Sequence, residues 1–418
     1  MDDPGGHAPT PLTVALVHYT APPVVGGVEH VLGHHARLMA DAGHNVRLIA
    51  GRGRSPDSRV AFVRVPRADS CHPAVLRLQA ELDAGRVPRG FDRVVAALAD
   101  RVAGALAGVD VLIAHNVCSL NRNLALTAAI REIACRPGAP RILLWHHDLA
   151  WTLPAHRRTL HPGYPWDLLR TPIPGAEQVT ISLARQADLA ALLAIPLDAI
   201  RVVPNGVDPA ALLGLGPATI RLVRATGLAS LDPLVLLPAR IMLRKNIELA
   251  LRVVAAMRRQ GRPKAGLVVT GPVDPHDPAG GVYFAELHAL RHALDLDDGA
   301  VFLADVLAGP APDALVHDLY RLADLLLFPS RDEGFGLPIL EAAVSRLPIV
   351  CSDLPALRDL AAGAAAYFDP NADPRAVAAL ALARLDADPG VAFARRVRAE
   401  CSWEAVYRRA IAPLLDRS

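Results

Sequence analysis

Cysteine and aromatic residues are scarce in this sequence, and both shortages limit what the protein can be. Its 418 residues include 5 cysteines, and Phe, Trp and Tyr together make up 4%. The cysteines are scattered, odd in number and never spaced as Cys-x-x-Cys, which argues against a disulfide framework and a zinc site. Reduced thiols, buried like small apolar side chains, are the simpler interpretation. The five are Cys71, Cys118, Cys135, Cys351 and Cys401.

The sequence also lacks an excess of charge of either sign. Lys and Arg number 44 against 42 Asp and Glu, and no long block of one sign occurs. The chain therefore offers no docking face for nucleic acid. Any anion that it binds should be small.

Long hydrophobic runs are missing as well. No stretch approaches the ~20 apolar residues that a membrane-spanning helix needs. The first eleven residues, MDDPGGHAPTP, contain acids, proline and glycine instead of a basic region followed by an apolar run, so we expect no secretory signal. These features predict a cytoplasmic protein without a transmembrane segment, and they leave peripheral membrane contact open.

What the sequence does contain is enough apolar material for more than one domain. Hydrophobic residues make up 52%, and the length of 418 residues exceeds the size at which one core stops growing. Short apolar runs alternate with amphipathic stretches, a pattern typical of βαβ units. We therefore predict an α/β protein made of two doubly wound, Rossmann-like domains. The expected strands are LTVALV, NVRLIA, VAFVRV, VDVLIAH, RILLWHH, QVTIS and IRVVPN in the first half, and LVLLPAR, GLVVTG, AVFLAD, LLLFPS and LPIVCSD in the second.

The segment PNGVDPAALLGLGP, residues 204–217, divides the two halves. Its Asn-Gly pair and spaced prolines predict a turn and a linker. We place the domain boundary here, with residues 1–205 in the first domain and residues 206–395 in the second. Doubly wound sheets bind ligands at the carboxyl ends of their strands, so the chemistry should lie on loops that follow strands.

The segment DEGFGLPILEAA, residues 332–343, places two glutamates eight positions apart around a glycine- and proline-containing turn. A predicted strand precedes it, and Pro338 suits the first position of the following helix. The amino end of that helix would attract anions, and the two glycines would let the backbone come close to a ligand. Glu333 on the loop and Glu341 one helical turn later would then face one region. A dipole-complementing acid and a solvated loop acid are the alternative.

The segment LLPARIMLRKNIELAL carries two bases between a predicted strand and a helix that should begin near Asn246. A fixed guanidinium at Arg240 and a mobile ammonium at Lys245 suit a diphosphate, the first through paired hydrogen bonds and the second as a point charge. We expect Arg244 to face solvent. Surface bases without a ligand are the alternative for either residue alone.

Gly26 and Gly27 open a helix after the first strand, in VHYTAPPVVGGVEH. The segment lacks G-x-G-x-x-G, so a dinucleotide fingerprint is weak here. A Gly-Gly turn can still press its amides against a phosphate or leave room for a bulky ligand. A simple helix start is the alternative.

Histidines gather at the ends of two predicted strands. His115 closes VDVLIAH, and His146, His147 and Asp148 follow RILLW. A histidine beside an aspartate could transfer protons or donate to a sugar hydroxyl, although a structural histidine is the commoner case. We favour a functional role for His147 more than for His115.

The stretch from 149 to 175 is rich in Pro, Trp, His and Arg and has little periodicity. Long irregular segments inside a compact domain are usually functional, so this one could wall an acceptor pocket. Its candidate residues are Trp151 and Arg157.

Metal signatures are lacking: the Asp-x-Asp pairs at Asp295 and Asp386 suit solvated loops, and no H-E-x-x-H, P-loop lysine or G-x-S-x-G occurs. We predict no metal and no cofactor.

Together these motifs resemble the retaining GT-B glycosyltransferases, specifically glycosyltransferase family 4 with its glycosyl transferase group 1 domain. The resemblance spans nearly the whole chain and is more specific in the second half. It implies two Rossmann-like domains facing across a cleft, with residues 396–418, which include SWEAVYRRA, crossing back to the first domain. The motifs that carry it are the Gly26-Gly27 loop, PNGVD at Pro204, Arg240 and Lys245 in A-R-x4-K, and Glu333-x7-Glu341 around GFGLP.

The resemblance also implies roles for these residues. The donor would be a nucleotide sugar held mainly by the second domain, with Glu341 on the ribose, Glu333 on the sugar hydroxyls and the diphosphate between the two bases. His147 matches the family's first-domain histidine near the sugar, although His146 beside it leaves the assignment open. The implied catalytic residues are His147, Arg240, Lys245 and Glu333. The implied donor contacts are Gly26, Gly27, Arg240, Lys245, Glu333, Phe335, Gly336, Leu337 and Glu341, and the acceptor-side candidates are His115, His146, Trp151 and Arg157.

The chemistry that the resemblance implies for these residues is retaining transfer of a hexose to a hydroxyl, and we expect it to need no metal. Negative charge grows on the departing diphosphate as the anomeric bond breaks, and preorganised cations with a helix amino end would stabilise it. A UDP-glucose or GDP-mannose type of donor fits, and so do small-molecule, glycan and lipid-linked acceptors. The alternatives are a sugar-nucleotide epimerase or glycoside-cleaving enzyme on the same fold, and a non-catalytic nucleotide-sugar-binding protein.

Overall fold

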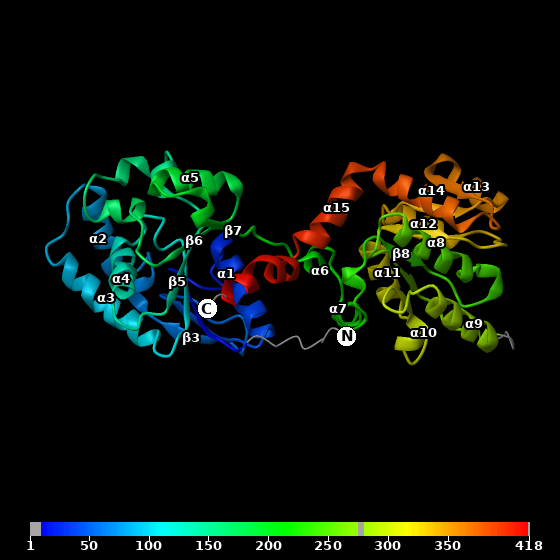
Figure 1. Cartoon of the computed structure of the whole chain (residues 1–418), viewed down its shortest axis with the longest axis horizontal. Helices are drawn as coiled ribbons and strands as arrows, with labels where there is room; N and C mark the ends of the chain where they lie inside the picture. Colours follow the sequence, from blue (N-terminus) through cyan, green and yellow to red (C-terminus); the bar gives the residue numbers. More distant parts are fainter. Residues whose placement is uncertain (1–9, 275–279, 417–418) are drawn as a thin grey trace, which may run out of the picture. The chain divides into compact units, whose positions relative to one another are not determined.

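The computed structural model describes residues 10–274 and 280–416. They form two compact units (Figure 1): unit 1 comprises the chain up to Gly206 together with the chain from Trp403 onward, and unit 2 comprises Val207–Ser402. Most of the acidic, glycine-containing start considered above, residues 1–9, lies outside the described residues. Among the described helices, none is long and apolar enough to cross a bilayer.

Unit 1 is built on a seven-stranded sheet in which every neighbouring pair of strands is parallel. Its spatial order is β3-β2-β1-β4-β5-β6-β7. In the central strand β1, Val14 lies opposite Val46 of β2 on one side and Val111 of β4 on the other. The strands are β1 (Thr13–Val17), β2 (Asn45–Ala50), β3 (Ala61–Arg64), β4 (Val111–His115), β5 (Arg141–His146), β6 (Glu177–Thr180) and β7 (Ile200–Val202).

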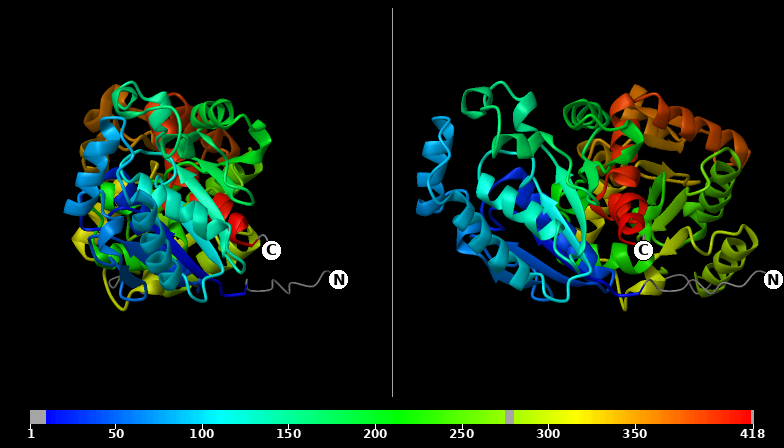
Figure 2. Two further views of the ribbon diagram at one scale, coloured as in Figure 1. Left: turned by 90° about the vertical axis from the view of Figure 1, so that its left-hand side faces the viewer. Right: turned by 60° about the vertical axis from the view of Figure 1, so that its left-hand side comes forward.

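Helices cover both faces of this sheet because its strands are apolar on both sides (Figure 2). Along β1, Val14 and Leu16 pack into one core with α1 and the C-terminal segment, while Ala15 and Val17 pack into a second core with α3 and α4. The helices are α1 (Gly27–Asp41), α2 (Pro73–Asp83), α3 (Phe91–Ala105), α4 (Leu124–Ala134), α5 (Leu183–Leu193), α16 (Trp403–Val406) and α17 (Ala412–Leu415), with a π-helical turn at Tyr407–Ile411 and 3-10 turns at Pro66–Ala68, Ala150–Thr152, Arg157–Thr159, Trp166–Arg170 and Leu197–Ala199.

Unit 2 repeats the design with a six-stranded parallel sheet in the order β10-β9-β8-β11-β12-β13. The prediction of two doubly wound α/β domains is therefore confirmed. The strands are β8 (Leu234–Leu237), β9 (Gly266–Val269), β10 (Ala300–Phe302), β11 (Leu325–Phe328), β12 (Ile349–Ser352) and β13 (Ala365–Phe368). The helices are α6 (Pro209–Leu212), α7 (Pro217–Thr226), α8 (Ile247–Arg259), α9 (Gly280–Ala293), α10 (Leu303–Val306), α11 (Asp313–Leu322), α12 (Leu337–Val344), α13 (Pro355–Ala361), α14 (Pro374–Asp386) and α15 (Pro389–Glu400), with 3-10 turns at Leu228–Ser230, Leu243–Lys245 and Ala362–Ala364.

The chain returns to unit 1 later than the predicted residue 396, because α15 continues to Glu400 within unit 2. Two arginines hold α15 there: Arg395 pairs with Asp232 at 2.8 Å, and Arg398 pairs with Asp324. The returning segment begins at Trp403, which is 1% exposed in the core beside α1.

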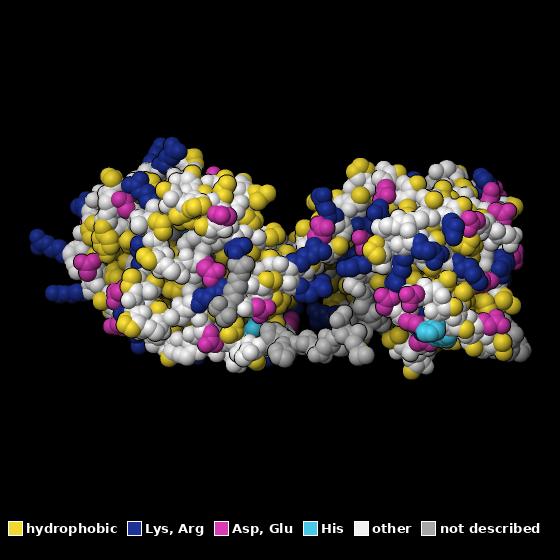
Figure 3. Space-filling view, in the orientation of Figure 1, with side chains coloured by type: hydrophobic (Ala, Val, Ile, Leu, Met, Phe, Trp, Pro, Cys, Tyr) yellow, Lys and Arg dark blue, Asp and Glu magenta, His cyan; other side chains and the backbone are white. Residues whose placement is uncertain are grey.

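Charges of both signs are mixed over the face shown in Figure 3, with no field of a single sign.

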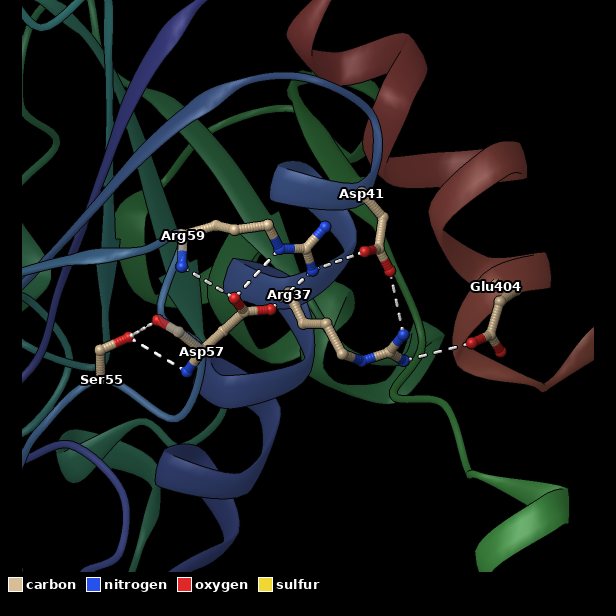
Figure 4. Close-up of polar contacts among 6 residues, drawn as sticks. All are labelled: Arg37, Asp41, Ser55, Asp57, Arg59 and Glu404. Carbon is tan, nitrogen blue, oxygen red and sulfur yellow. Dashed lines mark hydrogen bonds and ion pairs between the residues drawn. The ribbon is translucent and has the colours of Figure 1, made fainter. Parts of the chain in front are cut away.

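Polar contacts fix the returning segment from outside the core. Within unit 1, Arg37 on α1 pairs with Glu404 at 3.2 Å and with Asp41 at 3.1 Å (Figure 4). Arg59 binds the other Asp41 oxygen at 2.7 Å and pairs with Asp57. The network ties α16 to α1 and to the loop before β3.

Candidate functional site

Each sheet has a point at which the order of strand addition reverses, and several of the predicted site residues follow the strands beside it. The reversal lies between β1 and β4 in unit 1 and between β8 and β11 in unit 2. Loops that follow two such strands diverge, which leaves room for a ligand at their carboxyl ends. Lys245 follows β8 and Glu333 follows β11, while His18 follows β1 and His115 ends β4.

Lys245 and Glu333 form an ion pair at the reversal point of unit 2. The Lys245 ammonium contacts Glu333 Oε1, and the two side chains are 12% and 9% exposed. The Ser330 hydroxyl donates to the same carboxylate oxygen at 2.7 Å. The ammonium also lies 5.1 Å from the centre of the Phe328 ring, within cation–π range. A base and an acid predicted from separate segments are thus brought together in a largely desolvated place.

The two loops that carry this pair are joined along their length. The Arg331 amide donates to the Arg244 carbonyl at 2.8 Å, and the Arg331 guanidinium pairs with Glu248 in the first turn of α8 at 2.8 Å. Arg244 was expected to face solvent. Its side chain is 46% exposed, yet Nη1 lies 3.7 Å from Glu333 Oε2, because the joined loops direct it toward the pair.

Asn246 holds the backbone beside Lys245. It lies in the left-handed region with φ of 54°, a conformation that Asn tolerates better than most residues, and it is 1% exposed. Its side-chain amide donates to the carbonyls of Pro329 at 3.1 Å and Pro370 at 2.9 Å. The sequence marked this position only as the expected start of a helix. The structure shows a bridge from the start of α8 to the loops after β11 and β13.

Arg240 does not join the ion pair within the described residues. Its side chain is 61% exposed, and Nη1 lies 4.0 Å from Asp274 Oδ1. The guanidinium that was expected to be fixed is therefore largely exposed. A role in holding a diphosphate stays a prediction.

The amino end of α12 is shaped by Gly336. This residue has φ of 98°, and a Cβ at this position would lie 2.6 Å from Leu357 Cδ2, so only glycine fits without rearrangement. The helix begins at Leu337, which puts Pro338 at the second position instead of the predicted first. Phe335 and Leu337 beside it are 54% and 60% exposed.

Glu341 is fixed by a tyrosine from another helix. The hydroxyl of Tyr320 on α11 donates to Glu341 Oε2 at 2.5 Å. Burial raises the pKa of Tyr320, and its hydrogen bond to Glu341 raises it further, so the hydroxyl keeps its proton. No pattern in the sequence pointed to this partner, because Tyr320 lies 21 residues away in an amphipathic helix.

In unit 1 the structure separates the roles of His146 and His147. Both ring nitrogens of His146 are used inside the domain: Nδ1 lies 2.5 Å from the Ser119 hydroxyl and Nε2 lies 2.8 Å from Gln178 Oε1. His147 instead places Nε2 3.2 Å from Nδ1 of His115. Both ring nitrogens of His146 therefore already have partners inside the domain. Its acceptor-side role stays a prediction.

Burial keeps these histidines neutral. It lowers the pKa of His147 to about 3, with His18 and His146 adding repulsion, and it lowers the pKa of His146 to about 4. The pKa of His115 is also lowered by burial. At neutral pH His147 is thus an uncharged imidazole, which donates a hydrogen bond from one ring nitrogen and accepts one at the other.

Asn116 positions His147 and was missed by the sequence analysis. It follows β4 directly, has φ of 58° and is 1% exposed. Its Oδ1 accepts from the His147 amide at 2.7 Å and from the Asp148 amide at 3.2 Å. The available signal was an asparagine at a strand end, where Asn often adopts the left-handed conformation.

The glycine pair on the first loop has two different environments. A Cβ on Gly26 would lie 2.1 Å from Glu29 Oε2, whereas a Cβ on Gly27 would meet nothing within 4 Å. Gly26 therefore makes room for Glu29, which accepts from the Thr20 hydroxyl and lies 3.8 Å from His18 Nε2. No phosphate contact is needed to explain this glycine, so the predicted donor role stays untested.

The remaining acceptor-side candidates lie on the irregular segment. The Trp151 indole donates to the Trp166 carbonyl at 3.3 Å, and the Arg170 guanidinium lies 4.2 Å above its ring. Arg157 is exposed on a 3-10 turn. Trp151 thus has a structural task, and the acceptor role of both stays a prediction.

The described residues contain no group of three or more His, Cys, Asp or Glu that could hold a metal ion.

Comparison with known proteins gives matches in both halves of the chain. Residues 25–211 match the family model described as Glycosyltransferase Family 4, and residues 221–395 match the one described as Glycosyl transferases group 1. D-inositol 3-phosphate glycosyltransferase of Nocardia farcinica is 32% identical over 197 residues, 45% of this chain and 41% of that protein. Serotype-specific mannosyltransferase WbdA of Escherichia coli is 35% identical over 83 residues, 20% of this chain and 10% of that protein. The chain thus matches less than half the length of either relative. Sucrose-phosphate synthase from Thermosynechococcus elongatus aligns with a TM-score of 0.37 and 18% identity, over 97% of this chain and 98% of that one.

Proposed function

The chain belongs to the glycosyltransferases of family 4 with a group 1 domain, and we propose that it moves a hexose from a nucleoside diphosphate sugar to a hydroxyl acceptor. We propose that the donor is of the UDP-glucose or GDP-mannose type. We further propose that configuration is retained and that no metal takes part. The single observation that carries the proposal is the largely buried pair of Lys245 and Glu333 at the reversal point of the second sheet.

This pair supplies the two functions that donor cleavage needs. The Lys245 ammonium, which is 12% exposed, would interact with a diphosphate in a medium of low dielectric, where its charge is worth more than at the surface. The amides at the start of α12, beyond Gly336, would add further positive potential. Glu333 would bind hydroxyls of the sugar ring. Charge developing on the leaving diphosphate would then be stabilised by groups already in place.

We propose His147 of unit 1 as a further catalytic residue. Because its imidazole is neutral, it can hydrogen-bond to a sugar hydroxyl without placing a positive charge beside a developing cation at the anomeric carbon. Asn116 holds its backbone, and His115 contacts its ring. A cytoplasmic location is part of the proposal and agrees with the free cysteines of the described chain.

Transfer kinetics after three substitutions test the proposal. Lys245→Ala and Glu333→Gln should each lower the transfer rate by about 10²–10³, the typical cost of removing a preorganised electrostatic group. Arg240→Ala should cost less, since its side chain is 61% exposed. Lys264→Ala, the same change at an exposed lysine, serves as the control. Wild-type rates in all three variants would refute the assigned roles, and cleavage of an aryl glycoside without nucleotide would favour a hydrolase.

The donor base can be found by thermal shift. Uridine, guanosine and adenosine diphosphates and their sugar forms would each be added to the full chain. A ligand that binds only the folded state must raise the melting temperature. The base that gives the largest rise in the wild type, and a much smaller rise in Lys245→Ala, identifies the donor class.

A further inference from the structure

Unit 1 contains a cavity of about 570 Å³ that the proposed reaction does not use. It lies among α2, α3 and the amino end of α4, apart from the histidines described above. Eight of its twelve lining residues are apolar, including Val75 and Leu78 of α2 and Val94 and Leu98 of α3. Figure 3 shows hydrophobic side chains gathered over this end of unit 1, with basic side chains projecting near them.

The cavity exists because α2 packs loosely. Along its eleven residues only Val75 and Leu82 are buried, and Leu76 on its outer side is 50% exposed. The helix lies at the margin of the unit, beyond α3 and α4 (Figures 1 and 2). The cavity volume falls within the ~300–1,000 Å³ typical of small-molecule sites. Its apolar walls suit hydrocarbon better than a sugar.

The charged residues of the lining leave a net positive charge at this cavity. Glu81 is neutralised by Arg86, whose Nε lies 2.9 Å from its carboxylate. Arg67 and Arg77 are exposed and form no ion pair with any residue that the structure describes. Two unpaired guanidinium groups beside apolar walls match an amphiphile that has an anionic head and an alkyl chain.

One loop connects this cavity to the histidine site. It begins at Asn116, which holds the His147 amide, and ends at Asn123, which lines the cavity. Asn123 donates to the Arg67 carbonyl at 2.9 Å and accepts from the Leu126 amide at 3.2 Å, so it ties the 3-10 turn after β3 to the start of α4. Arg67 and Asn123 follow β3 and β4, so the cavity opens at the carboxyl edge of the sheet, where the histidines also lie.

We propose that this cavity binds the hydrocarbon tail of a lipid-linked acceptor whose phosphate is held by Arg67 and Arg77. This inference rests on the proposed function, since it names the acceptor class for the same reaction. The acceptor hydroxyl would lie toward His147, the phosphate beside the two arginines and the tail between α2 and α3. The apolar walls select the tail, and the arginines select the negative charge.

Binding of decyl phosphate below its micelle concentration tests the proposal. Calorimetric titration of the full chain should show one site, with butyl phosphate and uncharged decyl glucoside each binding at least about tenfold more weakly, because each lacks one of the two matched features. The double variant Arg67→Gln with Arg77→Gln should weaken decyl phosphate about tenfold. Arg101→Gln, at an exposed position of α3 outside the lining, is the matched control and should bind as the wild type does.

A second variant separates the cavity from adventitious detergent binding. Leu78→Trp fills the space between α2 and α3 and should abolish decyl phosphate binding while leaving the thermal shift with nucleoside diphosphates unchanged. Equal binding by the wild type, the double arginine variant and Leu78→Trp would overturn the proposal. So would an equal affinity for butyl phosphate.

The outcome also distinguishes this proposal from the proposed function. Nucleotide binding and sugar transfer to a small polar acceptor, without decyl phosphate binding, would overturn the lipid acceptor and leave the transferase standing. Decyl phosphate binding with the expected variant pattern, but without any nucleotide-dependent melting shift, would overturn the acceptor role and the transferase together and leave only an amphiphile site.

Discussion

Lys245 and Glu333 neutralise each other, which has a consequence for nucleotide affinity. The ammonium contacts the carboxylate, and Arg244 lies 3.7 Å from the second oxygen of that carboxylate. A diphosphate bound as we propose would therefore compete with Glu333 for these two cations. Glu333, which we propose to bind the sugar, would at the same time weaken binding of the bare nucleotide.

We expect Glu333→Gln to bind the nucleoside diphosphate about fivefold more tightly, equivalent to ~1 kcal/mol, because the competing negative charge is gone. Sugar transfer should nevertheless fall. Titration calorimetry measures the first effect and product formation the second. Asp332→Asn, an exposed neighbour with the same change of charge, should alter neither. Weaker nucleotide binding in Glu333→Gln would show that the carboxylate does not compete.

Asn246 gives a prediction about stability. Its amide donates to two carbonyls, so Asn246→Asp would turn a buried donor into a carboxylate that faces two acceptors. We expect a loss of about 2–4 kcal/mol in the free energy of unfolding. Asn246→Gly keeps the left-handed backbone and should cost only about 1–2 kcal/mol for the lost hydrogen bonds. Calorimetric melting of both variants checks the order, and an Asp variant at least as stable as the Gly variant would contradict it.

Adjacent histidines show what a sequence leaves undecided about single residues. His146 and His147 are neighbours of one type, and their order in the chain does not say which ring turns inward. Ser119 and Gln178 decide this for His146, and they lie 27 and 32 residues away from it. Lys245 and Glu333 were predicted as separate site residues. Their direct contact needed the strand order β8-β11.

The start of α12 depends on one glycine, and the chain offers a matched comparison. Gly336→Ala would place a methyl group 2.6 Å from Leu357 in a left-handed conformation. The left-handed backbone alone would cost an alanine about 1–2 kcal/mol. Relief of the clash with Leu357 would also shift the first turn of the helix. We expect weaker nucleotide binding and a lower melting temperature. Gly334→Ala, where a Cβ meets nothing within 4 Å, should change neither quantity by a comparable amount.

Most strands could be predicted from the sequence, and the exception has a physical explanation. All twelve apolar runs proposed as strands contain one in the structure. The missed strand, β13, is AAYF at Ala365–Phe368, within an alanine-rich stretch. Alanine has little β preference, and a strand of this length carries too few side chains to show a period. Pairing with β12 supplies what the local sequence lacks.

The buried histidines make unit 1 sensitive to acid. His35 packs against Trp145 and Trp403, and neither of its ring nitrogens has a hydrogen-bond partner among the described residues. Burial lowers its pKa to about 3. The unfolded chain binds this proton near its ordinary pKa, so the folded state loses stability as the pH falls below about 6.5, and the loss continues down to the folded pKa.

His35→Phe should remove this share of the acid sensitivity. At pH 5 the free energy of unfolding of the variant should exceed that of the wild type by about 2 kcal/mol, in addition to any difference at pH 7.5. The reason is that the variant has no histidine to protonate at this position. Melting curves from pH 7.5 to 4.5 would measure it. A difference in melting temperature that does not grow with acidity would contradict the assignment. His292→Phe, at an exposed histidine of unit 2, is the control for a histidine change of the same kind.

The route of the chain between the units bears on how the protein emerges from the ribosome. Val207 donates its amide to Cys401 at 2.8 Å, so unit 2 leaves and rejoins the rest of the chain at one place. Residues 207–402 form an uninterrupted piece that can fold as soon as it has been synthesised. Unit 1, whose core includes Trp403 and Ile411, cannot complete that core until these residues have been synthesised. The half made first is therefore finished last, and during that interval the apolar face that Trp403 covers is open to chaperones.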